Sequence, residues 1–317
     1  MKAFIIALVA GLVWFFQTDR AAAATTNIYF TQFEAAEGYS TNFTLVGQGG
    51  WVGDGSGDNG VVNQYLLGQG QQALVGGASP VPTDDSLIVW RPINFNPITA
   101  GYPIVKFSVL MNIADSLNNQ WDTFRWSIYN IQGVRLFSID FDNYPQYLDV
   151  GYRLDGTNTT QFTSLKFVNN SNYTLAVTMN FASNRWSATL NNNVITTNQL
   201  ITTTGASLTF GDADAVWLIF NTNAPGDNYL LFDNYRITAE NLAVTPAQVQ
   251  FLGRTAEGWS LLRVFGDNNA RWALDATTNL VNWTALKTNQ VSGTFFDHVD
   301  NTAVGLPRRF YRARYVP

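Results

Sequence analysis

Residues 173–195 read YTLAVTMNFASNRWSATLNNNVI, and this stretch decides the fold class. From Tyr173 to Phe181 every second residue is large and apolar, while small or polar residues fill the positions between them. Successive side chains of a β-strand point to opposite faces, so this alternation predicts a strand with one buried face. The turn-forming residues ASN then lead into a second alternating run that begins at Arg185. The stretch therefore predicts a β-hairpin.

The same period of two recurs along most of the chain. It is present at residues 104–113, 134–141, 147–156, 215–222 and 229–238, and turn-forming Gly, Asn and Pro residues separate these runs. No segment keeps a helical period over a dozen residues. Many short strands at this spacing predict an all-β chain with an antiparallel sandwich or barrel.

The composition limits the chemistry available to the protein. Among 317 residues, 46% are hydrophobic and only 13% are charged, with one histidine and no cysteine. A chain of this length can bury a core without disulfides, and it has no thiol and only one imidazole for the catalytic and zinc sites that depend on these groups. The composition therefore favours a protein that holds a ligand over one that cleaves it.

The first 24 residues have the pattern of an export signal. Lys2 provides a positive start, Ala3–Phe16 is an apolar run that is short for a membrane span, and Ala21–Ala24 offers small residues for a signal peptidase. No later segment is long and apolar enough to cross a membrane. We therefore expect a secreted or cell-surface protein with a signal peptide at 1–24 and no membrane span.

Charge divides the remaining chain into two parts. Residues 25–244 hold 8 Lys and Arg against 17 Asp and Glu, whereas residues 245–317 hold 8 against 5. A nucleic-acid binder needs a concentrated basic surface, so we expect no nucleic-acid partner. The change of balance coincides with the end of the strand pattern at 229–238, and it predicts two domains, 25–244 and 245–317.

The larger predicted domain resembles the concanavalin-A-like lectin/glucanase jelly rolls, in particular laminin-G-like modules. The resemblance rests on the opening FEAAEGY at 33–39, the hairpin at 173–195 and the closing LLFDNYRIT at 230–238. It implies an antiparallel jelly-roll β-sandwich over about residues 28–242. It also implies a structural calcium ion between the first and last strands, where Glu34 and Asp233 occupy the comparable positions and offer hard oxygen ligands.

The last seventy residues resemble a small C-terminal β-module of exported bacterial proteins. The run RWALDATTNLVNWTAL at 271–286, the segment GTFFDHVDN and the segment PRRFYRARYV carry this resemblance. It implies an immunoglobulin- or fibronectin-like sandwich and a bacterial origin, and it assigns no activity to the module.

One further stretch, QWDTFRWSIYN at 120–130, suggests a binding surface. Alternation predicts that Phe124, Trp126 and Ile128 face a core, which leaves rings, a guanidinium and hydroxyls in a row on the opposite, solvated face. Sugar rings stack on exposed aromatic side chains, and polar neighbours recognise their hydroxyls. If the following strands pair in sequence, they add residues to the same face. The predicted site comprises Trp121, Arg125, Tyr129, Asp140, Tyr147, Asp149, Arg153 and Arg185.

The sequence thus favours a non-enzymatic carbohydrate-binding protein whose partner is a polysaccharide or a surface glycan. Two alternatives remain open. One is a structural or adhesive surface protein with protein partners. The other is a glycan-cleaving hydrolase that uses Asp140 and Asp142, which lie about 7 Å apart by strand rise and share one strand face.

Overall fold

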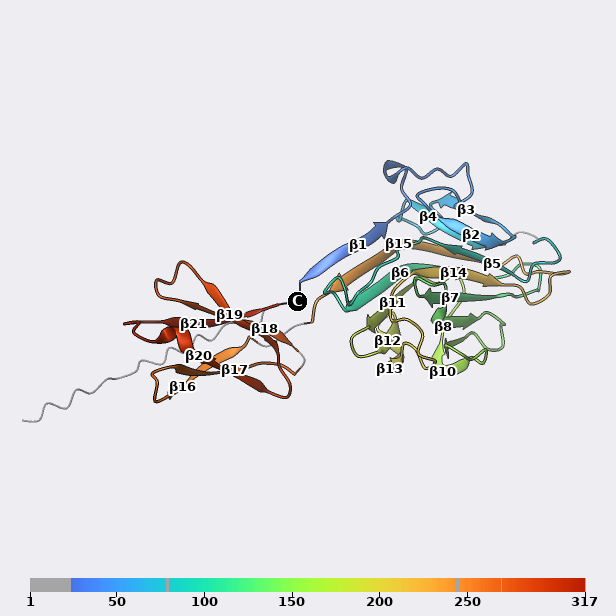
Figure 1. Cartoon of the computed structure of the whole chain (residues 1–317). Helices are drawn as coiled ribbons and strands as arrows, with labels where there is room; N and C mark the ends of the chain where they lie inside the picture. Colours follow the sequence, from blue (N-terminus) through green and yellow to red (C-terminus); the bar gives the residue numbers. More distant parts are fainter. Residues whose placement is uncertain (1–23, 78–79, 243–245, 269, 317) are drawn as a thin grey trace, which may run out of the picture. The chain divides into compact units, whose positions relative to one another are not determined.

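The computed structural model describes residues 24–77, 80–242, 246–268 and 270–316. The described chain forms two compact units, Ala24–Leu242 and the residues that follow position 245 (Figure 1). Its only helices are the short 3-10 turns η1 (Ala35–Glu37) and η2 (Asn301–Ala303). Within these described ranges no helix is long and apolar enough to span a membrane. The predicted signal peptide at 1–24 lies, except for Ala24, outside the described residues.

The first unit consists of two antiparallel sheets. The eight-stranded sheet has the order β13-β12-β11-β6-β15-β4-β3. The remaining strand, β1, pairs with the part of β15 that β4 does not reach. The seven-stranded sheet has the order β10-β9-β8-β7-β14-β5-β2. The strands of the first sheet are β1 (Thr25–Thr31), β3 (Asn59–Asn63), β4 (Gln71–Gly76), β6 (Ile104–Ala114), β11 (Tyr173–Asn180), β12 (Arg185–Leu190), β13 (Asn193–Leu200) and β15 (Tyr229–Glu240). Those of the second are β2 (Val52–Gly55), β5 (Ser86–Trp90), β7 (Thr123–Tyr129), β8 (Arg135–Asp142), β9 (Asp149–Leu154), β10 (Gln161–Lys166) and β14 (Asp212–Leu218).

The two sheets enclose one aromatic core, which confirms the predicted antiparallel sandwich. Phe107 of β6 lies 5.2 Å from Trp126 of β7, and Phe137 of β8 stacks on Trp186 of β12 at 3.9 Å between ring centroids. The buried Tyr235 hydroxyl on β15 donates to the carbonyl of Ala213 on β14 at 2.9 Å. The burial of these rings and the contacts between them are the main source of stability in such a core.

The hairpin predicted at 173–195 is confirmed as β11 and β12. Its register pairs Val177 with Ala188 and Met179 with Trp186, so the alternating apolar residues enter the core. The chain then continues to β13 and keeps to the same sheet. The sequence therefore specified this hairpin through the burial of one strand face.

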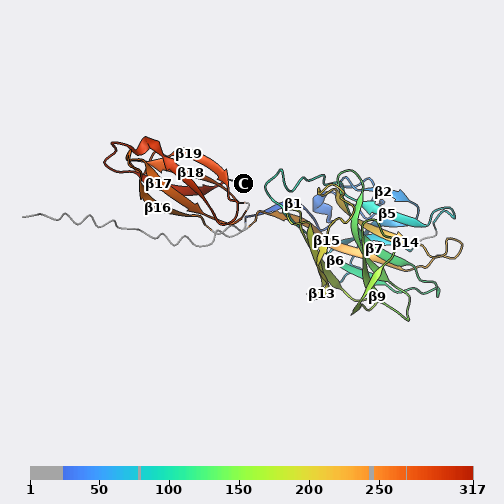
Figure 2. The same ribbon diagram turned by 60° about the horizontal axis from the view of Figure 1, so that its bottom comes forward.

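Strand β15 organises the eight-stranded sheet. Its first residues pair with β4, its last residues pair with β1, and its opposite edge pairs with β6 along nearly its whole length (Figures 1 and 2). In the pairing of β15 with β6, the register shifts between Asp233 and Arg236. The closing strand is thus a central one and not an edge of the sheet.

The second unit has two three-stranded antiparallel sheets, β16-β17-β20 and β19-β18-β21. Leu262 and Val264 from the first sheet and Trp272 and Leu274 from the second form its core. This unit is therefore a small all-β unit with its own core. Its strands are β16 (Gln248–Arg254), β17 (Ser260–Phe265), β18 (Arg271–Thr277), β19 (Thr284–Gln290), β20 (Phe295–Asp300) and β21 (Phe310–Tyr315).

Candidate functional site

The outer face of the seven-stranded sheet carries two arginines around one carboxylate. Arg125 on β7 donates from Nε and Nη2 to the two oxygens of Asp140 on β8, at 2.6 and 3.2 Å. Arg153 on β9 donates from Nε to Asp140 Oδ2 at 2.6 Å. The hydroxyls of Ser138 and Thr160 also donate to Asp140. We call these five residues the arginine network, and it ties three neighbouring strands together on the face turned away from the core.

This network corrects the expectation that the row on β7 is solvated. Arg125 is 9% exposed and Ser127 is 1% exposed, although both alternate with core residues. Arg125 lies against Asp140 of the neighbouring strand, to which it donates two hydrogen bonds. A buried guanidinium requires a paired acid, and Asp140, itself only 6% exposed, provides it.

The charge state of Asp140 bears on the hydrolase alternative. Burial alone would raise the pKa of this carboxyl, but the hydrogen bonds and positive charges of Arg125 and Arg153 hold the pKa below its usual range. A general acid needs a carboxyl whose pKa is raised toward neutrality. Its strand neighbour Asp142 accepts from the backbone N–H of Tyr144 at 3.1 Å. Asp140 is therefore held as a carboxylate, and its geometry fits ion pairing better than proton donation.

Gly151 leaves the space that the network needs. In the sheet it lies opposite Asp140 on one side and Phe162 on the other. A Cβ at this position would lie 2.5 Å from Thr160 Cγ2 and 3.0 Å from the carbonyl oxygen of Gln161. The absence of a side chain therefore allows Thr160 to approach Asp140, to which its hydroxyl donates at 2.7 Å.

Three aromatic rings gather at the end of the same sheet where β7 begins and β8 leads into β9. Trp121 and Tyr144 lie 5.8 Å apart, and Tyr144 and Tyr147 lie 5.7 Å apart, between ring centroids. The indole N–H of Trp121 donates to Asp115 Oδ1 at 3.1 Å, which fixes the ring. Tyr144 is 44% exposed and Tyr147 is 51% exposed. We call these three rings the ring cluster; Tyr144 was not part of the predicted row.

The remaining residues of the predicted row are dispersed. Tyr129 lies on the expected face, opposite Asp212 of β14. Asp149 begins β9 and forms an ion pair with Lys166. The prediction for Arg185 is wrong, because β12 belongs to the eight-stranded sheet and the Arg185 guanidinium donates to the carbonyl of Asn198. The chain pairs in sequence from β7 to β10 and then crosses to the other sheet at β11, and alternation alone does not reveal that crossing.

A pair of carboxyls that sequence reasoning missed lies beside this row. Asp212 and Asp214 are two residues apart on β14, and Asp214, which is 5% exposed, pairs in register with Ser127. Burial raises the pKa of Asp214 well above its usual value, and the charge of Asp212 raises it further. Asp214 Oδ1 has no hydrogen-bond partner among the described residues. The sequence GDADAV at 211–216 contains this pair of aspartates, and they have the same two-residue spacing as Asp140 and Asp142.

The two predicted calcium ligands, Glu34 and Asp233, differ in their surroundings. Asp233 is fully buried; its Oδ1 accepts from the Asn234 N–H at 2.6 Å, while its Oδ2 has no partner among the described residues. Glu34 Oε1 accepts from the N–H of Gln71 at 3.1 Å. Burial raises the pKa of Asp233 to about 7; the Asn234 N–H opposes this, and the negative charges of Glu34 and Glu37 add to it.

An unpaired buried carboxylate oxygen is a donor that suits a hard cation. Asp233 has such an oxygen, and the charge of Glu34 acts on it. In the part of the chain that the structure describes, no group of three or more His, Cys, Asp or Glu residues is placed to hold a metal. Any further ligands would have to be amide or carbonyl oxygens.

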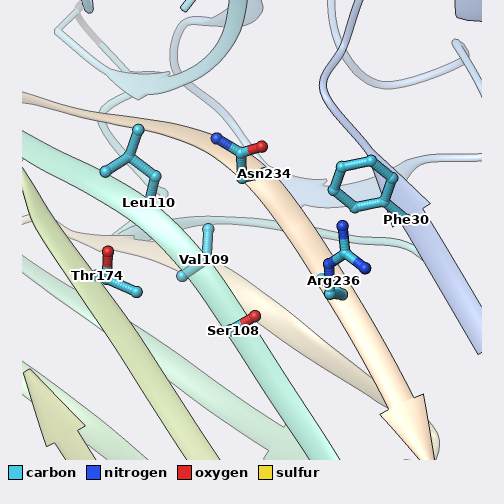
Figure 3. A pocket seen from close by; sticks show the side chains of 7 residues that line it. All are labelled: Phe30, Ser108, Val109, Leu110, Thr174, Asn234 and Arg236. Carbon is cyan, nitrogen blue, oxygen red and sulfur yellow. The ribbon is translucent and has the colours of Figure 1, made fainter. Parts of the chain in front are cut away.

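A shallow cavity of about 250 Å³ lies on the eight-stranded sheet, away from the arginine network. Figure 3 shows Arg236 turned toward Phe30, and the guanidinium lies 4.0 Å above the ring centroid. Ser108, Thr174 and Asn234 provide its polar lining. Apart from Arg236 this cavity holds no charged side chain, so it offers less for recognition than the seven-stranded sheet does.

No protein-family model and no curated protein matches the chain. The CBM2 module of an evolved Dit protein from Lactobacillus casei BL23 phage J-1 is 11% identical, with a TM-score of 0.47 over 69% of this chain and 98% of its own. Winged bean acidic lectin with methyl-alpha-D-galactose is 9% identical, with a TM-score of 0.44 over 69% of this chain and 98% of its own.

A sialidase is 10% identical with a TM-score of 0.43, and the match covers 70% of this chain but only 19% of that chain. These neighbours include lectin and carbohydrate-binding domains. At identities and TM-scores this low, they do not indicate what this chain binds or whether it catalyses a reaction. The fold rests on the strand pairing described above.

Proposed function

We propose that residues 24–242 bind a glycan along the outer face of the seven-stranded sheet, from the ring cluster to the arginine network. The observation that carries this proposal is the placement of three partly exposed rings at one end of a face whose polar groups are already fixed by hydrogen bonds. Trp121 precedes Arg125 by four residues, so the two parts are separated by roughly 13 Å of strand rise. An elongated ligand such as a polysaccharide fits this spacing.

The ring cluster and the arginine network, at the two ends of the proposed site, both suit a sugar chain. Aromatic faces offer an apolar surface for sugar C–H groups, and fixed polar side chains give orientation and specificity. The arginine network needs no rearrangement to present its donors, which lowers the entropic cost of binding. We further propose that the protein binds without cleaving and acts outside the cytoplasm of a bacterium, at the cell surface or in extracellular polysaccharide. The apolar run at Ala3–Phe16 supports this location.

Loss of a ring should weaken binding and leave the fold intact. We expect Tyr147→Ala, and separately Trp121→Ala, to lower glycan affinity by about tenfold or more, since a stacked ring contributes on the order of 1.4 kcal/mol. The measurement is isothermal titration with a polysaccharide selected on a glycan array. Tyr65→Ala is the matched control, because Tyr65 is 57% exposed and lies outside the seven-stranded sheet. Equal affinity of all these variants and the original chain would refute this site.

We also propose that Glu34 and Asp233 hold a calcium ion that stabilises the junction of β1 with β15. The support is the unpaired buried oxygen of Asp233 close to the charge of Glu34. Calcium should raise the melting temperature of the protein at pH 8, by several degrees at saturating concentrations. The Glu34→Gln variant should lose most of this increase. A melting temperature that is the same in calcium and in chelator would exclude the ion.

A further inference from the structure

Three guanidinium groups converge on the outer face of the seven-stranded sheet. Arg125, Arg135 and Arg153 come from the consecutive strands β7, β8 and β9. They are three of only eight basic residues in the acidic stretch 25–244. Asp140 is the carboxylate that pairs with two of them, and Arg135 forms no ion pair among the described residues. Arg135 therefore differs from the other two arginines, because it bonds to backbone carbonyls and to no carboxylate.

The hydrogen bonds leave part of each outer guanidinium available. Arg153 uses only its Nε atom, which contacts Asp140 and Thr160. Arg135 uses only Nη2, which donates to the carbonyls of Leu154 and Thr157. The other guanidinium nitrogens of Arg135 and Arg153 have no protein partner among the described residues, and none is a buried atom. They form a set of N–H donors that can reach a ligand from solvent.

The three guanidinium groups lie close enough to act on one another electrostatically. Burial lowers the pKa of Arg135, and repulsion by Arg125 and Arg153 lowers it further. Asp212 and Asp214 of the adjacent strand β14 are further carboxyls on this face; burial raises the pKa of both, and the charge of Asp212 raises that of Asp214 further. Arg135 and Arg153 keep N–H donors that the protein does not use, and an anionic ligand could pair with them.

We propose that the glycan bound by this face is acidic, and that the carboxylate or sulfate on its sugar is held by Arg135 and Arg153 with Arg125 beneath them. Guanidinium groups pair with both kinds of anion through two parallel N–H donors. The ring cluster would then contact a neighbouring sugar of the same chain. This assignment rests on the proposed function and specifies its ligand class.

The test uses two matched pairs of polymers and the chain from residue 25. Polygalacturonate is compared with its fully methyl-esterified form, and dextran sulfate is compared with dextran, by affinity electrophoresis and titration. We expect at least tenfold tighter binding of one charged polymer than of its neutral counterpart, and this preference should fall as salt rises. Preference for polygalacturonate identifies a carboxylate, and preference for dextran sulfate identifies a sulfate.

Variants test whether the arginines cause the preference for a charged polymer. Arg135→Gln should remove about tenfold of the affinity for the charged polymer. Arg185→Gln is the matched control, because Arg185 also bonds only to a backbone carbonyl but lies on the other sheet, and it should change nothing. Arg135→Lys keeps the charge and should restore part of the affinity, which separates a charge effect from a loss of folding.

The outcomes also separate the two proposals. Binding of a neutral polymer equal to that of its charged form overturns the acidic ligand and leaves the glycan-binding proposal standing. Charged-polymer binding that Arg135→Gln and Arg185→Gln reduce equally overturns the assigned position. Failure to bind any of these polymers, together with a blank glycan array, overturns both proposals.

Discussion

Asp140→Ala is expected to lower the free energy of unfolding of the first unit by about 3–5 kcal/mol, because removal of one partner leaves buried charge uncompensated. Asp140 is the acid shared by Arg125, which is almost fully buried, and by Arg153. Without it, two guanidiniums face each other across three strands. The same variant should abolish glycan binding, since both arginines lose the contact that positions them. Urea denaturation followed by tryptophan fluorescence measures the first effect, and titration measures the second.

Asp142→Ala is the matched control for this prediction. Asp142 lies two residues further along β8, is partly exposed and accepts a hydrogen bond from the N–H of Tyr144. Its loss should cost about 1 kcal/mol or less. If the two variants were equally stable, Asp140 would not be the centre of the network.

The second large effect concerns Asp233 and pH. In the folded protein its pKa is about 7, whereas the value for an unperturbed aspartate is 3.8. The stability that this shift contributes is present in full below about pH 4, and it is lost as the pH rises to about 7, because the folded state must then ionise a buried group. In calcium-free buffer the wild-type chain should therefore lose stability between these two values.

Asp233→Asn should remove this loss, because the amide keeps the shape of the side chain without its charge. At pH 8 without calcium the variant should be more stable than the original chain by about 2–4 kcal/mol, given that one pKa unit corresponds to about 1.4 kcal/mol. Denaturation curves at pH 4, 6 and 8 provide the measurement. Asp54→Asn serves as the control, because Asp54 is exposed. Parallel pH profiles for Asp233→Asn and the original chain would contradict the prediction.

The fold class could be predicted because a strand with one buried face alternates apolar and polar residues along the sequence. Val177 and Met179 alternate with polar residues, and they face the core in the pairing that the pattern required. Alternation indicates which face of a strand is buried, but it does not indicate which sheet the strand joins. That is why Arg185 was assigned to the wrong sheet, although its own strand was recognised.

The candidate site could be predicted only in part, for a related reason. Arg125, Asp140 and Arg153 were expected on one face, and the structure joins them by hydrogen bonds. Their burial was not expected, since a polar residue in an alternating strand is ordinarily exposed. Asp214 was missed because its neighbours Ala213 and Ala215 are small, which weakens the alternation that would have identified the outward positions.

The central position of β15 has a consequence for how the first unit is assembled during synthesis. Thr25 of β1 bonds to Glu240 of β15 across 215 residues of sequence, and β4 and β6 also meet through β15. Contacts between residues so far apart in sequence form slowly, because the intervening chain must first close into a long loop. Until β15 has been synthesised, the strands β13-β12-β11-β6, the pair β4-β3 and the strand β1 have no partner that joins them, and their unpaired edges are sites of aggregation. A chain that stops before residue 229 should therefore accumulate as insoluble material.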